Sequence, residues 1–465
     1  MQQSPQQEKK MEILQIADAP VHRQPSYQIT PVTNRRKYSS YKEKLDQLTI
    51  INEDLENEYN NEQSDFIHGL YNQLKTIIGV GLLVIPYGFK ATGWIQGIIT
   101  LSISALLSAQ CVFKLNDILE SLPAPIFGHQ IATQYGYIGQ VIFGQYMKII
   151  IQILTLTYHL GSCTSYLIFF HDFFNQVFSH LAFNVPPLVQ AFFLILIILP
   201  VTFDNNIHHL YTSSMFGVVC VFISCIIILY NDVHTLIEND EPKQINNTFN
   251  LNGFLYFLGI SIFSFQGVGT VFYIKSSLQN PSEIKSIYGL SILIALILYI
   301  ICGTISYFSY GKNINVIILD NISQGLVTKL LYSLSLLMTY PLIGIPCFQI
   351  IENYAQQIII KYKNRESMTH NQIQKVKDYT LYVVRTVCLL SIYLVAICIP
   401  QFSQFISQIG GISGILFQIT IPTLLFLKFY EKKLPILRLI FESLLLATSL
   451  GLAIIILVIE VRYLL

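Results

Sequence analysis

The stretch Asn72–Trp94, NQLKTIIGVGLLVIPYGFKATGW, decides the fold of this chain. It is apolar and long enough to cross a bilayer. It carries Gly79, Gly81, Pro86 and Gly88, and each of these residue types weakens a helix. Within hydrocarbon, unwound backbone is tolerated only where it lines a cavity or is buried in protein. We therefore expect a broken helix, whose first half ends near Ile78 and whose second half starts near Leu82.

A break of this kind exposes both poles of the backbone. Carbonyl groups at the end of the first half suit an ammonium or another cation, and N–H groups at the start of the second half suit a carboxylate. One break could thus hold both charges of a zwitterion. The alternative is that the glycines only allow neighbouring helices to pack closely.

Composition places the whole chain in the membrane class. Of its 465 residues, 52% are hydrophobic and only 12% are charged, about half the charged fraction of a globular domain. The net charge of +1 and the lack of a basic patch give no sign of nucleic-acid binding. The eight cysteines lie in or beside apolar segments, without metal-ligand spacing to histidine, so we expect buried free thiols and no metal or cofactor.

We predict an all-α polytopic membrane protein with eleven transmembrane helices. Residues 1–65 are polar and are expected to form a disordered cytoplasmic tail, and residues 66–465 the membrane domain. The predicted spans are about 70–90, 94–116, 141–170, 188–203, 210–230, 253–275, 287–309, 326–351, 381–399, 402–428 and 437–460.

Basic residues set the predicted orientation. With the N-terminus inside, thirteen basic residues fall on inner segments: Lys114, Lys148, Lys275, Lys285, Lys361, Lys363, Arg365, Lys375, Lys377, Lys428, Lys432, Lys433 and Arg438. Only five fall outside: Lys90, Lys243, Lys312, Lys329 and Arg462. This asymmetry follows the positive-inside rule. Both N-x-S/T sequons, at Asn246 and Asn321, also fall on outer loops, which predicts a glycoprotein.

The sixth span repeats the interruption of the first. Gly267-Val268-Gly269 echoes Gly79-Val80-Gly81, and each motif lies in the first span of a block of five. Because five is odd, the second block inserts upside down relative to the first. Paired interrupted helices in two inverted halves are typical of a transporter with a site at the membrane midplane. We assign repeat one to about 66–230, repeat two to about 253–428, and an extra helix to about 437–460.

Five motifs, in order, resemble the amino acid/auxin permease family within the LeuT-type transporters, which have a five-plus-five inverted repeat. IGVGLLVIPYGFKATGW resembles the first span of vacuolar and proton-coupled amino acid transporters. The other four are LPVTFDNNIHHL (199–210), FSYGKNINVIILDNIS (308–323), MTYPLIGIPCFQIIENY (338–354) and VRTVCLLSIYLVAICIPQFSQFISQIGGISG (384–414).

The resemblance implies secondary active transport of amino acids by alternating access, coupled to protons or sodium. Its substrate would rest on the two broken spans, with help from the third, eighth and tenth. Carried onto this chain, the binding residues are Ile77, Ile78, Gly79, Val80, Gly81, Ser264, Phe265, Gln266 and Gly267. Tyr158 on the third span could cover the substrate as a gate, or could be an ordinary core aromatic.

The resemblance also assigns Lys75 and Thr339 to coupling. Sodium-coupled members of the family carry an Asn at the position of Lys75 and a Thr at that of Thr339. An ammonium at Lys75 would exclude sodium by charge, which favours coupling to H+ rather than Na+. The alternative is that Lys75 snorkels to the interface. Proton-coupled members have a His where this chain has Asn72, and His68 lies one turn earlier. The other ionisable candidates for proton transfer, at span ends, are Asp172, His159, His171 and Glu352, each of which we expect to be an interfacial residue rather than a proton relay. Lys75 itself could titrate if burial lowers its pKa.

Two functions remain open. The first is a transporter of neutral amino acids, working as a monomer in the vacuolar, lysosomal or plasma membrane. The second is an amino-acid sensor that signals through the N-terminal tail. The sequence lacks the His-x-x-x-His and Gly-x-Ser-x-Gly patterns and paired membrane carboxylates, so an enzyme is not expected.

Overall fold

The computed structural model describes residues 64–122, 134–180, 185–203, 207–238, 245, 250–322, 325–362, 370–399, 401–431 and 433–464. Within these ranges the regular structure is helical, apart from one isolated bridge between Ser64 and Leu278. Nearly all of the predicted tail, and the sequon at Asn246, lie outside the described residues.

Fifteen α-helices make up the described part of the membrane domain. They are α3 (Phe66–Ile77), α4 (Gly81–Thr92), α5 (Trp94–Ser121), α6 (Gln134–Phe143), α7 (Gln145–His180), α8 (Pro187–Thr202), α9 (Ile207–Glu238), α10 (Leu251–Ser264), α11 (Val268–Ser277), α12 (Ile284–Tyr310), α13 (Gly325–Tyr362), α14 (His370–Cys398), α15 (Phe402–Gln408), α16 (Ile421–Phe429) and α17 (Ile436–Leu464). Two π-helical segments, η6 (Ile409–Gly414) and η7 (Leu416–Thr420), join α15 to α16.

Local sequence explains several of these boundaries. The Asp65 side chain accepts a hydrogen bond of 2.8 Å from the backbone N–H of His68, which caps the start of α3. Gly93 adopts a φ of +89° between α4 and α5, and Gly311 adopts a φ of +53° where α12 ends. These left-handed conformations are costly for residues with a Cβ atom, so glycine places the turns between spans.

Within the described residues, nine helical stretches are long and apolar enough to cross a membrane, and the bent pair α3 and α4 makes a tenth. Each coincides with one of the predicted spans. The predicted fourth span corresponds to α8, whose described apolar stretch, Phe193–Thr202, is shorter than a bilayer crossing. The all-α polytopic fold is therefore confirmed, and the count of eleven stays a prediction.

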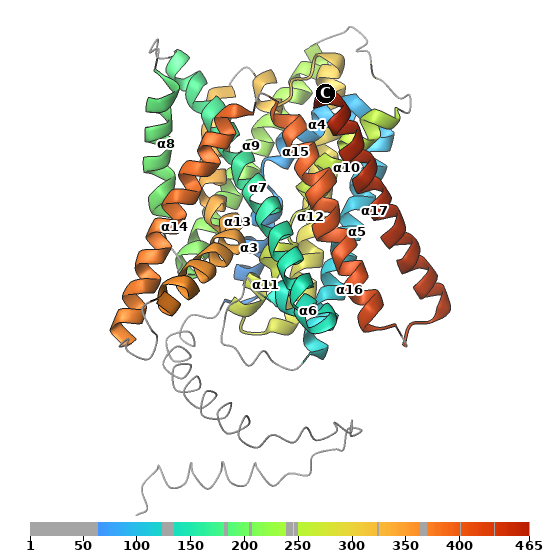
Figure 1. The fold of residues 1–465 in the computed structure, drawn as a ribbon. Coiled ribbons are helices and arrows are strands. Elements are labelled where there is room, and N and C mark those ends of the chain that lie inside the picture. Colours follow the sequence, from blue (N-terminus) through green and yellow to red (C-terminus); the bar gives the residue numbers. More distant parts are fainter. Residues whose placement is uncertain are drawn as a thin grey trace, which may run out of the picture. The chain divides into compact units, whose positions relative to one another are not determined.

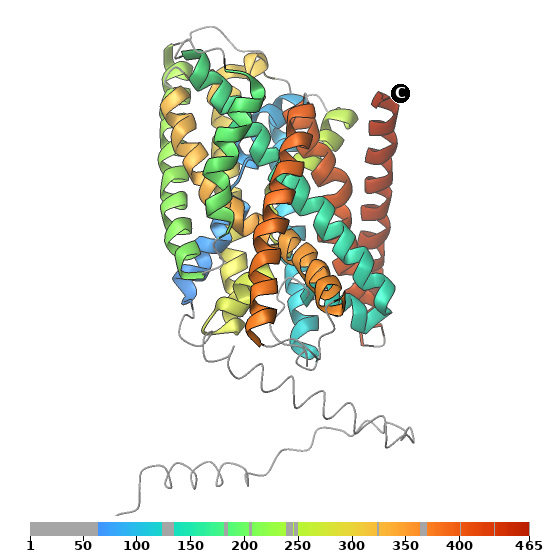
Figure 2. The same ribbon diagram turned by 60° about the vertical axis from the view of Figure 1, so that its left-hand side comes forward.

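Burial separates central spans from peripheral ones. In the most apolar segment of the stretch from α10 to α11, 94% is buried inside the protein, whereas in the most apolar segment of α17 only 22% is buried. Both views place α17 at one edge of the bundle (Figures 1 and 2). Its outward side chains include Leu444, Ile454 and Leu457, all more than two-fifths exposed. Such a surface is unfavourable in water and suits contact with lipid.

Polar contacts fix this peripheral helix at both ends. Near its start, Glu442 forms a buried ion pair of 2.5 Å with Lys114 on α5. Near its end, Glu460 accepts hydrogen bonds from Gln404, at 3.2 Å, and Gln408, at 2.6 Å. Lys114, which the sequence assigned to an inner segment facing water, is thus an internal contact of the membrane domain.

Candidate functional site

The first predicted break is present. Helix α3 ends at Ile77, α4 begins at Gly81, and the two axes meet at 46°. Between them the backbone turns tightly, because the N–H of Gly79 bonds the carbonyl of Ile77 at 3.0 Å. Ile78 and Val80 are buried within this turn. The sequence therefore located the interruption to within a residue of its observed ends.

The second predicted break is also present. Helix α10 ends at Ser264 and α11 begins at Val268, which leaves Phe265, Gln266 and Gly267 between them. All three are buried. Of the echoed motif, only Gly267 lies in the break, because Gly269 already belongs to α11.

The fold brings the two breaks into contact. A Cβ atom built on Gly81 would lie 2.9 Å from the Ser264 Cβ and 3.0 Å from its Cα. This approach needs glycine, since real Cβ atoms do not come so close to a neighbouring backbone. Two segments far apart in the sequence thus form one central site.

Hydroxyl groups cap the carbonyl ends that the sequence analysis expected to be free. Tyr299 on α12 donates to Ile77 O, at 2.8 Å, and lies 3.2 Å from Ser264 O, so one side chain joins both breaks. Tyr332 on α13 donates to Gly79 O at 2.8 Å. Ser108 on α5 donates to Phe265 O at 3.0 Å. In this conformation the carbonyl pole of the site is therefore occupied by protein hydroxyls.

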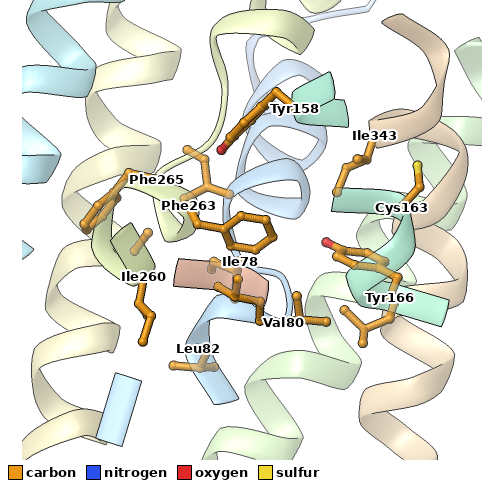
Figure 3. Close-up of a cluster of buried hydrophobic side chains, with 14 of the residues drawn as sticks. Ile78, Val80, Leu82, Tyr158, Cys163, Tyr166, Ile260, Phe263, Phe265 and Ile343 are labelled. Atoms are coloured by element: carbon orange, nitrogen blue, oxygen red, sulfur yellow. The ribbon is translucent and has the colours of Figure 1, made fainter. Parts of the chain in front are cut away.

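A polar stripe on α7 faces the breaks. His159 contacts Gly269, Ser162 donates to the Gln266 side chain at 2.9 Å, and the Tyr166 hydroxyl lies against Gly79. The hydroxyl end of Tyr166 points toward the broken helix that carries Ile78 and Val80 (Figure 3). Residues 159, 162 and 166 share one helical face. This spacing in an apolar span was a signal that sequence reasoning missed.

Tyr158 lies in the core beside the stripe. Its side chain is 1% exposed, its hydroxyl accepts a 2.8 Å hydrogen bond from Gln418, and its ring stacks on Phe417 at 5.5 Å. Gln418 also donates to Ile262 O at 3.1 Å, so it links Tyr158 to α10. Both partners belong to the π-helical η7, a distortion often found at functional sites. The role of Tyr158 as a gate stays a prediction.

The snorkelling alternative for Lys75 is wrong for this structure. Its side chain is 1% exposed and its ammonium donates to the Ser335 hydroxyl on α13. Ser335 in turn donates to Gly217 O on α9 at 2.9 Å. Thr339 lies one turn further along α13 and bonds Ser335 O, so it reaches Lys75 only through Ser335. Within the described part of the chain, no carboxylate pairs with Lys75.

Two other ionisable residues form a buried ion pair. Glu352 on α13 pairs with Arg385 on α14 at 2.7 Å, and both are buried. Asn72, which replaces the His of proton-coupled relatives, is buried in α3.

The described residues hold no group of three His, Cys, Asp or Glu side chains placed to bind a metal ion. Their cysteines are free thiols, of which Cys398 is exposed, contrary to the expectation of burial for all eight.

Comparison with known proteins places this architecture. The family model described as transmembrane amino acid transporter protein matches residues 62–463. The chain belongs to this family. Members of the family are membrane transporters rather than enzymes, which confirms that prediction.

Two curated relatives match most of this chain, but the match covers different shares of the relatives' own lengths. Amino acid transporter AVT3A of Arabidopsis thaliana is 24% identical, over 80% of this chain and 84% of the relative. Vacuolar amino acid transporter 3 of Saccharomyces cerevisiae is 24% identical over 76% of this chain, which spans about 50% of that longer protein. A solved Na+-coupled sialic acid symporter has a TM-score of 0.48 at 13% identity, over 78% of this chain and 80% of that one.

Proposed function

We propose that this protein is a secondary active transporter of amino acids that works by alternating access. The observation that carries this proposal is the contact between two broken helices at the centre of the bundle. Membership of the amino acid transporter family supports it. We further propose eleven spans, with α8 as the fourth, arranged as five-plus-five inverted repeats and followed by α17.

The proposed substrate site is formed by Ile77–Gly81 and Ser264–Gly267, beside Tyr158. The substrate ammonium would take the place of the hydroxyls of Tyr299 and Tyr332 at the carbonyl ends. Its carboxylate would accept hydrogen bonds at the N-terminal ends of α4 and α11, where helix N–H groups lack intrahelical partners. Because every residue of the two breaks is buried here, substrate entry requires a change of conformation.

We propose a small or mid-sized neutral amino acid as substrate. The side chains around the breaks, Ile78, Val80 and Phe265, are apolar, and neither break contains a carboxylate. A cationic side chain would lack a counter-charge there, and burying an unpaired charge is costly.

The proposed coupling ion is the proton. Lys75 lies one turn before Gly79, and its buried ammonium bonds Ser335. A fixed ammonium repels sodium at short range in a low-dielectric setting. We therefore assign Lys75, with Ser335 and Thr339 behind it, to the exclusion of sodium.

We propose that the protein is a monomer in the vacuolar membrane, with its N-terminus in the cytoplasm, in line with the name of the yeast relative.

An outer cavity of about 770 Å3 lies at the ends of α4, α10, α15 and α17, lined by Tyr87, Lys90, Tyr256 and Glu460 among others. Because α10 runs from this cavity to the second break, we propose the cavity as the outer entrance for the substrate. Asn321 already bonds Asn313 O at 3.2 Å and Asn315 N–H at 2.8 Å, so Asn246 is the better candidate for glycosylation.

The test is uptake into proteoliposomes with an amino-acid panel, with and without pH and sodium gradients. We expect uptake of neutral amino acids that rises when the donating side is acidified and is unchanged when choline replaces sodium. Lys75→Asn should reduce the proton dependence or introduce a sodium response. Deletion of residues 1–60 should leave most of the flux, whereas a sensor would lose its partner. A strict sodium requirement in the wild type would contradict the assignment of Lys75.

A further inference from the structure

The most informative unexplained group is the imidazole of His159. Its side chain is 3% exposed, in the middle of α7, and its Nδ1 lies 2.9 Å from the carbonyl oxygen of Ile343 on α13. A carbonyl oxygen can only accept a hydrogen bond, so Nδ1 carries the hydrogen. In the neutral ring Nε2 is then a bare acceptor. Within the described part of the chain, Nε2 has no hydrogen-bond partner.

Nε2 is directed at the second break. It lies against Gly269, where a Cβ atom would collide with it and would stand 2.7 Å from Cε1. Gly269 is the second residue of α11, in the first turn after Gly267. This turn is where helix N–H groups lack intrahelical partners, and it is the end that favours an anion. A basic lone pair and an anion-binding helix end therefore share one small space.

Among the described residues, no charged side chain pairs with this ring. Its neighbours are Tyr158, edge-on at 5.7 Å, and Phe417, edge-on at 5.9 Å. The buried titratable side chains on this part of α7 and on the elements packed against it include Tyr158, Cys163 and Tyr166 of α7, Tyr135 of α6, and Tyr340 and Cys347 of α13. All of these are neutral at physiological pH. Within the described residues no ion pair includes His159, and the buried cations Lys75 and Arg385 are bound to Ser335 and Glu352.

We propose that Nε2 of His159 is the atom that takes up the coupling proton, and that the substrate carboxylate is its counter-charge. The inference rests on the proposed function and names the proton site within it. A proton from water on the acidic side forms an N–H bond with the Nε2 lone pair, and no electron is transferred. The resulting imidazolium is costly to bury alone, but a carboxylate at the start of α11 neutralises it. On the other side the carboxylate leaves, and the proton returns to water.

This arrangement makes proton and substrate binding mutually dependent. If only the protonated site holds the carboxylate well, the apparent affinity scales with the protonated fraction. It then falls by about tenfold for each pH unit above the range in which His159 titrates in the empty protein. By linkage, the substrate raises proton affinity by the same factor that the proton raises substrate affinity.

The test compares two histidine variants of the same helix in full-length protein. His159→Asn keeps an N–H donor for Ile343 O but has no nitrogen that titrates. His171→Asn is the matched control. The Nδ1 atom of His171 also forms a hydrogen bond to a neighbouring helix, at 3.1 Å from the hydroxyl of Tyr393 on α14. The probe is an amino acid that the wild type accumulates, with a pH dye to follow the protons.

We expect wild type and His171→Asn to accumulate the amino acid down a proton gradient, with proton movement. His159→Asn should still exchange labelled for unlabelled amino acid, but should lose accumulation, proton movement and the pH dependence of its KM. Normal gradient-driven accumulation by His159→Asn overturns the proposal. Failure of the wild type to take up any amino acid would instead overturn the proposed function.

A second measurement covers variants that do not fold. If both His159→Asn and His159→Gln fail to reach the membrane, a chain that retains only His159 among its histidines can be labelled with 15N at the imidazole. Addition of the amino acid at constant pH should move the Nε2 signal toward the protonated position. An unchanged signal in a chain that binds the amino acid overturns the proposal.

Discussion

The two broken helices differ in how they are held. The halves of the first meet at 46°, whereas α10 and α11 continue as one span over Leu251–Ser277. In the first, Gly81 lies against the backbone of Ser264. In the second, the three atoms nearest to a Cβ built on Gly267 belong to side chains, among them Tyr288 Cε2 at 2.6 Å and Gln73 Nε2 at 3.1 Å.

This difference indicates separate roles for the two breaks. A neighbouring side chain can change its rotamer, but neighbouring backbone can move only with its helix. The first break therefore sets the geometry of the site, and the second has room to adjust. The asymmetry extends one turn further back, where Lys75 precedes Gly79 and the apolar Phe263 precedes Gly267.

The largest expected effect separates Gly81 from Gly267. In Gly81→Val the new side chain meets the Ser264 backbone, so we expect uptake below detection and a loss of stability of about 1–3 kcal/mol from overpacking. Gly267→Val should also abolish uptake, because it fills the proposed ligand space. The two alanine variants are the sharper comparison, since Gly267→Ala should keep measurable uptake while Gly81→Ala should not.

Uptake and thermal unfolding of the purified variants check this prediction, with surface expression as the control for folding. Equal uptake by the two alanine variants would remove the proposed difference between the breaks. Normal uptake by both valine variants would mean that the glycines serve helix packing alone.

A smaller effect is expected from the hydroxyl that joins the breaks. Tyr299→Phe removes the one O–H that donates to Ile77 O and is shared with Ser264 O, whereas Tyr332→Phe removes the O–H that donates to Gly79 O and touches the first break only. Each variant loses one O–H donor, at about 1 kcal/mol. Tyr299→Phe should lower stability more than Tyr332→Phe, because it leaves two buried carbonyl groups rather than one without this hydroxyl. Thermal unfolding in detergent measures both, and a larger loss for Tyr332→Phe would contradict the bridging role.

Much of this fold was predictable because membrane spans have strong local signals. Long apolar runs, the glycines at 79, 81 and 267, and the order of the spans all follow from the sequence and match the helices. The weakest of these predictions is the fourth span, because the described apolar stretch of α8 is too short to cross a membrane. The positions of the breaks were predictable because closely spaced glycines weaken a helix locally, even within a long apolar run.

The surroundings of the breaks were not predictable in the same way. Tyr299 and Ile77 are distant in sequence, and nothing in 28 tyrosines distinguishes the one that bridges both breaks. Lys75 could have snorkelled, and only the packing of α3 against α9 and α13 shows that it does not. Contacts that depend on tertiary packing leave no periodic pattern in the chain.

The smallest expected effect concerns selectivity at the second, more adjustable break. Gln266 accepts a hydrogen bond from Ser162 at 2.9 Å through its side-chain oxygen, which orients its amide and leaves the NH2 group as the end that can donate. A substrate with a hydroxyl or amide side chain could accept from it, whereas an aliphatic substrate could not. Gln266→Ala should therefore weaken competition by polar amino acids by up to about tenfold, equivalent to about 1.4 kcal/mol, and leave aliphatic ones nearly unchanged. Ser162→Ala, which frees the amide without removing it, should give a smaller shift in the same direction. Competition against a labelled aliphatic substrate measures both, and an equal loss for polar and aliphatic competitors would place Gln266 outside the side-chain pocket.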